Sequence, residues 1–177
     1  LSKTQPAKID FSNSLLWHRW LQPLWAVKQT LPAAFDHVKI ASELATLDRG
    51  EAKSYRVKLL AMLRQHLAAA TTKIERDFYS SNDGAIYVGQ HARCIDGLLT
   101  LLYDEAGKLM PQSHDIAVIA VGGYGRGEMA PFSDIDVMFL MPAKTGKKHE
   151  AAIEFMLYLL WDLGLKIGHS TRSITEA

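Results

Sequence analysis

The chain has 177 residues, with 20 Lys and Arg against 19 Asp and Glu, a formal net charge of +1, and 48% hydrophobic residues. This composition is typical of a globular protein with a sizeable core, and it gives no electrostatic basis for binding nucleic acid or an anionic membrane. The one cysteine, Cys94, excludes an intramolecular disulfide, and a lone free thiol favours a reducing compartment, so we expect a cytoplasmic protein. The longest apolar runs fall far short of the roughly 18 residues that indicate a membrane span. We therefore expect no nucleic-acid partner and no membrane partner.

The first part of the chain is expected to be helical after a short tail. Residues 1–13 are polar and contain Pro6, which predicts a flexible lead-in. Residues 14–110 form the predicted helical part, beginning with a short helix from Ser14 that Pro23 interrupts and a weak helical pattern over 36–47.

Two long helices dominate the rest of that part. Residues 51–80 carry apolar side chains at intervals of three and four, with Lys and Arg between them, which predicts an amphipathic helix. The cluster Ser80-Ser81-Asn82-Asp83-Gly84 predicts a loop, and a further helix is expected over 85–107.

The pattern changes from residue 111 onward, and we treat 111–177 as a separate core. Strands are predicted over 116–121 and 134–140, a helix over 148–163 with Gly164 as its terminating glycine, and a third strand over 165–174. Helices followed by this order indicate an α+β fold, in which a helical amino-terminal part packs on a small mixed sheet.

Two acidic residues, Asp134 and Asp136, lie two positions apart in the second predicted strand. Alternation puts both carboxylates on one face, roughly 7 Å apart along the backbone, while Ile135 and Val137 point into the core. Neighbouring like charges repel unless a cation compensates them, and hard oxygen ligands favour Mg²⁺ or Mn²⁺ over zinc. The pair therefore predicts a divalent metal site.

Upstream of the acidic pair, Gly122-Gly123 directly follows the first predicted strand and allows the backbone to approach a phosphate closely. Ser133 offers a hydroxyl beside the acids, and residues 125–128 are expected to begin a short helix whose free N–H groups face an anion. Arg126 has two readings, a phosphate contact or a structural pair with Glu128 or Asp134.

Each motif alone has an ordinary explanation. A Gly-Gly pair after a strand is usually only a turn, and a chance Asp-x-Asp pair is usually part of a surface strand or loop. Their joint arrangement indicates a nucleoside triphosphate held against a metal.

The stretch GGYGRGEMAPFSDIDVMFL resembles the signature of the DNA polymerase beta-like nucleotidyltransferase superfamily. With LLWDLGLKIGHSTRSITEA, it looks like the amino-terminal nucleotidyltransferase domain of the bacterial bifunctional PII uridylyltransferase/uridylyl-removing enzymes. Glutamine synthetase adenylyltransferases share the metal-binding pattern, but Tyr124, the Pro131-Phe132 pair and the Gly-His-Ser block favour the uridylyltransferases.

The resemblance implies a small mixed sheet of the nucleotidyltransferase type and transfer of UMP from UTP to a tyrosine of the PII nitrogen-signalling protein, with release of diphosphate. Gly122, Gly123 and Ser133 would hold the triphosphate, and Asp134 and Asp136 would hold Mg²⁺. Two alternatives stay open: another protein nucleotidyltransferase, such as an adenylyltransferase, and a non-catalytic nucleotide-binding module.

Two departures from that family qualify the expectation. The family's third carboxylate would lie beyond Ala177, since Glu176 does not match its position, and the HD hydrolase and ACT sensor domains are not in this sequence. Because Leu1 and the uncapped end at Ala177 indicate a piece of a longer chain, we expect this piece alone to be poorly active or inactive. His169 and Arg172 match the family block, and either a structural role or a nucleotide contact fits them.

Overall fold

The computed structural model describes residues 33–177. The expected lead-in over 1–13 and the helix expected from Ser14 lie outside the described residues. The described elements, in chain order, are α2 His37–Ala45, α3 Ala52–Ser81, α4 Gly84–Leu109, the 3₁₀ helix η3 Pro111–Asp115, β1 Ala117–Ala120, α5 Gly122–Gly125, β2 Ile135–Met141, α6 Lys147–Asp162 and β3 Ile167–Ser173. The expected α+β fold is confirmed.

The sheet has the order β1-β2-β3, with β2 in the centre. The pair β1 and β2 is antiparallel, with Ala120 opposite Val137, whereas β2 and β3 are parallel, with Asp136 opposite Gly168. The sheet is therefore mixed, as predicted. The carboxyl end of β1 and the amino ends of β2 and β3 meet at one end of the sheet.

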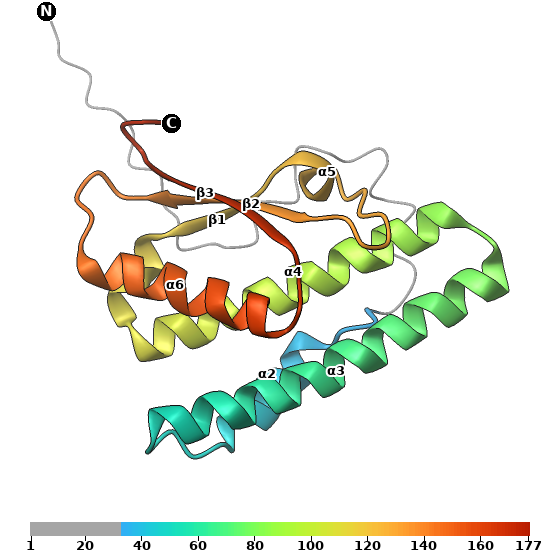
Figure 1. Cartoon of the computed structure of the whole chain (residues 1–177), viewed down its shortest axis with the longest axis horizontal. Coiled ribbons are helices and arrows are strands. Elements are labelled where there is room, and N and C mark those ends of the chain that lie inside the picture. Colours follow the sequence, from blue (N-terminus) through green and yellow to red (C-terminus); the bar gives the residue numbers. More distant parts are fainter. Residues whose placement is uncertain (1–32) are drawn as a thin grey trace, which may run out of the picture. The chain divides into compact units, whose positions relative to one another are not determined.

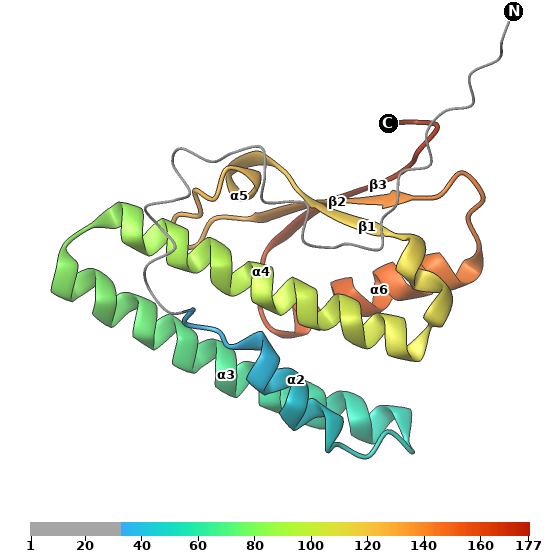
Figure 2. The same cartoon turned by 180° about the vertical axis from the view of Figure 1, so that it is seen from behind.

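Helices cover one face of this sheet. In Figures 1 and 2, α4 and α6 lie along that face, and α3 and α2 lie on the far side of α4. The covered face is apolar because Ile135, Val137 and Phe139 alternate along β2 and are all at most 2% exposed. The other face carries no helix from the described residues except the single turn α5 at one end (Figure 1).

Local signals set the ends of the helices. Asp36 and Asp83 accept hydrogen bonds from the backbone N–H groups of Lys39 and Ala85, at 3.0 and 2.8 Å, and so begin α2 and α4. Asn82 ends α3 in the left-handed conformation, with φ of 53°. The predicted terminating glycine Gly164 has φ of 81° just after α6.

The core includes one buried charge, Glu105 on α4, whose side chain is fully buried. Its carboxylate accepts hydrogen bonds from Arg49 at 3.1 and 3.2 Å, from Lys108 at 2.6 Å and from the phenol of Tyr55. Burial opposes ionisation, but the hydrogen bonds from Lys108, Tyr55 and Arg49 outweigh it and hold the pKa of Glu105 below its ordinary value. The cluster thereby fastens the turn before α3 to α4.

Across residues 33–177, every helix is too short or too polar to cross a bilayer.

Candidate active site

The two predicted metal ligands lie at the end of the sheet where β1 finishes and β2 begins. Asp136 is the second residue of β2 and is half-buried, and Asp134 comes one residue before β2 and is exposed. Ile135 and Val137 are buried among the helices, at 2% and 1% exposure. Alternation along the strand therefore places the two carboxylates on the face that the helices leave open.

The carboxylate of Asp136 occupies a slot between two glycines. A Cβ built on Gly122 would come within 2.7 Å of its Oδ2, and one built on Gly168 would come closer still to Oδ1 and within 3.5 Å of Cγ. Gly122 also has φ of 60°, a conformation that side chains other than glycine rarely adopt. The carboxylate keeps its position because neither neighbour carries a side chain.

The sequence pattern by itself assigns no role to Gly168. Its importance depends on the pairing of β3 with β2, which places it directly opposite Asp136. A glycine inside a predicted strand is the one signal that could have drawn attention to it, because such a glycine often marks a close approach.

The prediction that a short helix begins within residues 125–128 is wrong, because the helical turn α5 is formed by Gly122–Gly125 instead. The positive φ of Gly122 lets the chain turn into this helix immediately after β1. The turn is anchored below by Tyr124, a buried side chain whose hydroxyl donates to Oδ1 of Asp96 on α4 at 2.7 Å.

Arg126 directly follows α5, and its side chain bonds back to the first residue of that helical turn. Its Nη1 donates to the backbone carbonyl of Gly122 at 2.9 Å, and its Nε donates to Oε2 of Glu128 at 3.1 Å. Of the two structural partners that the sequence leaves open for Arg126, Glu128 and Asp134, the structure shows an ion pair with Glu128. The guanidinium remains largely exposed, and it has further N–H donors that these two bonds do not use.

Ser133 lies in a tight turn just before the acidic pair. Its backbone N–H and its hydroxyl both donate to the carbonyl of Ala130, at 3.2 and 2.9 Å. The residue is exposed. The hydroxyl oxygen still has lone pairs, so Ser133 is fixed in position without losing its capacity to accept a hydrogen bond.

His169 and Arg172, for which the sequence leaves both a structural role and a nucleotide contact open, lie on opposite faces of β3. His169 pairs with Val137, on the helix-covered face, and its ring lies 6.0 Å from that of Trp161 on α6. Arg172 is paired with Leu140, two alternations from Gly168, and so shares the open face with Asp136. His169 is exposed and lies on the opposite face of the sheet from Asp136, whereas Arg172 lies on the same face as Asp136.

Glu176 is occupied elsewhere. Its Oε2 accepts from the backbone N–H and the hydroxyl of Ser173, at 2.9 and 2.8 Å. These two bonds, the backbone one first, lower the pKa of Glu176. Its carboxylate thus caps the turn after β3.

The donor set at this end of the sheet fits a hard divalent cation only in part. Oxygen ligands from Asp134 and Asp136 suit Mg²⁺ or Mn²⁺, and neither Gly122 nor Gly168 places a Cβ against the oxygens of Asp136. Within residues 33–177, however, no group of three or more His, Cys, Asp or Glu side chains gathers around a common point. Mg²⁺ commonly binds through one or two carboxylates together with substrate phosphates, so two protein ligands are compatible with that ion.

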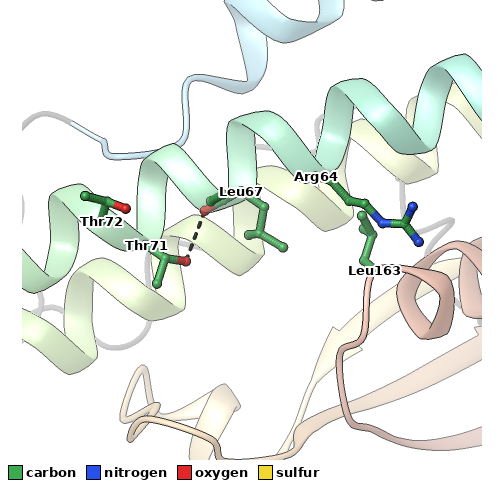
Figure 3. Close-up of a pocket in the computed structure, with 6 residues that line it drawn as sticks. Arg64, Leu67, Thr71, Thr72 and Leu163 are labelled. Atoms are coloured by element: carbon green, nitrogen blue, oxygen red, sulfur yellow. Dashed lines mark hydrogen bonds between the residues drawn. The ribbon is translucent and has the colours of Figure 1, made fainter.

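A hollow of about 400 Å³ lies elsewhere on the molecule, between α3 and the end of α6 (Figure 3). Its wall includes Arg64, Leu67, Thr71 and Leu163, and none of the predicted site residues. Two of its polar side chains bond to backbone carbonyls: Thr71 donates to the carbonyl of Leu67 at 3.0 Å, and Arg64 donates to that of Asp162 at 2.6 Å. The lining residues include no acidic side chain that could join Asp134 and Asp136 in a metal site.

Comparison with known proteins identifies the family. The nucleotidyltransferase domain family matches residues 104–177, which contain every predicted site residue. This part of the chain belongs to the nucleotidyltransferase family. The family predicted from the sequence is confirmed.

Among the proteins similar to this chain are bifunctional uridylyltransferase/uridylyl-removing enzymes. The one from Rhodospirillum rubrum is 41% identical over 128 residues, which is 68% of this chain and 14% of the relative. Those from Azospirillum brasilense and Rhodopseudomonas palustris are each 38% identical, over 78% and 82% of this chain. The chain spans only 16% and 17% of those two relatives. No solved structure matches the nucleotidyltransferase chain.

Proposed function

We propose that this nucleotidyltransferase chain is part of an enzyme that transfers UMP from UTP to a tyrosine of the PII signalling protein and releases diphosphate. The observation that carries the proposal is the Asp136 carboxylate, which lies between Gly122 and Gly168 on the open face of the sheet, with Asp134 two residues before it in the chain. The choice of UTP follows the names of the similar proteins, and the choice of PII follows the resemblance to the PII-modifying family.

Asp134 and Asp136 are the residues that would hold Mg²⁺, or Mn²⁺. When bound, such an ion lowers the pKa of the attacking hydroxyl and neutralises charge on the departing diphosphate. The residues of this chain contribute position: the strand fixes Asp136, and the turn of Ser133 fixes the chain just before Asp134.

The triphosphate is assigned to the turn between β1 and β2. The first N–H groups of a helical turn have no acceptor within it, so the amides of Gly122 and Gly123 are suited to phosphate oxygens. Ser133 would add a hydroxyl. Arg126 would add the guanidinium donors that its bonds to Gly122 and Glu128 leave unused.

The wider setting also belongs to the proposal. A third carboxylate would come from chain that follows residue 177, because Glu176 is engaged with Ser173. The free and buried thiol of Cys94 fits a reducing compartment, so we assign the enzyme to the cytoplasm.

The test uses the 177-residue chain beside a longer chain that continues past residue 177. Each is incubated with purified PII protein, Mg²⁺ and one of four labelled nucleoside triphosphates. We expect the longer chain to label a PII tyrosine from UTP, dependent on the metal, and the shorter chain to do so slowly or not at all. Label from ATP instead would make the enzyme an adenylyltransferase, and nucleotide binding without any transfer would indicate a non-catalytic module.

A further inference from the structure

The turn that precedes the acidic pair presents an unusual aromatic side chain, Phe132. It is 91% exposed, the highest value among the exposed large apolar side chains of residues 33–177. Its backbone has φ of 65°, in the left-handed region. For a residue with a Cβ this conformation costs roughly 1–2 kcal/mol.

The turn itself does not require phenylalanine. Residues 130–133 form a four-residue turn closed by the N–H of Ser133 on the carbonyl of Ala130, with Pro131 second and Phe132 third. A positive φ at the third position is the feature that favours glycine or asparagine there. Because the ring is almost fully exposed, packing does not explain the choice either.

The turn is nevertheless held firmly. The proline restricts its own φ, and the hydroxyl of Ser133 adds a second bond to the carbonyl of Ala130 at 2.9 Å. The ring therefore projects from a fixed support, and Asp134 lies only two residues further along the chain. Two residues span at most about 7 Å, so the backbone that carries the ring lies within that distance of Asp134.

We propose that Phe132 is the docking anchor for the protein acceptor, inserting into an apolar depression next to the hydroxyl that receives the nucleotide. This inference rests on the proposed function. A ring exposed on all sides is a protruding knob, and aromatic knobs that enter a partner's pocket dominate many protein interfaces. A support for the nucleotide base would instead have one face packed on the protein. The fixed turn limits the entropy lost on docking.

The experiment uses the full-length enzyme, purified PII protein and the variant Phe132→Gly. Glycine suits the positive φ, so this variant should melt at a higher temperature than the wild type. We expect the KM for PII, and the dissociation constant of PII measured directly, to rise about tenfold or more. The KM for UTP and the kcat at saturating PII should stay within about twofold of the wild type.

Two control variants fix the interpretation. Phe132→Tyr keeps the ring and should dock normally, and Tyr79→Ala removes another exposed aromatic side chain, on α3, and should change nothing. Unchanged PII affinity in Phe132→Gly would overturn the inference, as would a rise confined to the KM for UTP, which would assign the ring to the base. Failure of the wild type to modify PII would count against the proposed function, whereas the direct PII-binding comparison still decides the role of Phe132.

Discussion

Replacing Gly168 with alanine tests the slot around Asp136 without altering any charge. The new Cβ would overlap Oδ1 of Asp136 more severely than the 2.7 Å approach that a Cβ on Gly122 would make to Oδ2. Ordinary contact begins at 3.4 Å, so the carboxylate or the strand must move by roughly 1 Å. Because β3 is paired with β2 over seven residue pairs, from Ile135 and Ile167 to Met141 and Ser173, the side chain of Asp136 is the part that gives way.

The expected consequences separate stability from function. Overpacking of this kind typically costs about 1–3 kcal/mol of stability. A misplacement of about 1 Å in a catalytic group can cost about 100-fold in rate, so we expect kcat to fall by that order. Binding of Mn²⁺, followed by electron paramagnetic resonance without nucleotide turnover, should weaken in parallel.

The control for this variant is Gly84→Ala, at the first residue of α4, where an added Cβ meets nothing within 4 Å. It should be neutral or slightly stabilising and should leave both metal binding and transfer unchanged. If Gly168→Ala bound Mn²⁺ and transferred UMP as well as the wild type, the slot would have no part in placing Asp136, and the reasoning would be refuted.

Three further predictions concern the support of the site. Glu105→Gln should lower the free energy of unfolding at neutral pH. Because the pKa of Glu105 is depressed in the folded state, the stability that its charge contributes is present at pH values above the ordinary pKa near 4.5 and is lost as the pH falls through the folded pKa. Denaturant titrations of the two proteins should therefore converge in acid. Tyr124→Phe should cost about 1.5–3 kcal/mol by removing the hydrogen bond to Asp96 and should raise hydrogen exchange in α5, and unchanged exchange there would contradict the anchoring role. Burial raises the pKa of Cys94 to about 12, so a thiol reagent at pH 8 should label it only after denaturation, and rapid labelling of the native chain would show that α4 is open.

Much of the fold could be predicted because the sequence signals are local. The pattern over 51–80 corresponds to α3 at Ala52–Ser81, since the apolar spacing continues without interruption until the Ser-Ser-Asn-Asp-Gly loop. The strand expected over 134–140 corresponds to β2 at Ile135–Met141, because Ile135, Val137 and Phe139 alternate with residues of the open face.

The features that sequence could not predict depend on contacts between distant segments. Gly168 matters only because strand pairing sets it against Asp136, and His169 faces Trp161 because that same register fixes which side each residue takes. The start of α5 at Gly122 depends on a positive φ that glycine allows but does not require. The roles of Asp134, Asp136, Gly122, Gly123, Ser133 and Arg126 in binding metal and nucleotide stay predictions.

The most direct test of the central claim is the rate of UMP transfer to PII, measured in a single turnover with Asp134→Asn and Asp136→Asn in the full-length enzyme. Each change removes one negative charge and almost no volume, so we expect a loss of about 1,000-fold or more together with an unchanged or higher melting temperature, because repulsion within the pair is relieved. Asp104→Asn, an exposed aspartate on α4, is the matched control and should keep full activity. Transfer near the wild-type rate in either site variant would contradict the assignment of this pair as the metal-binding centre.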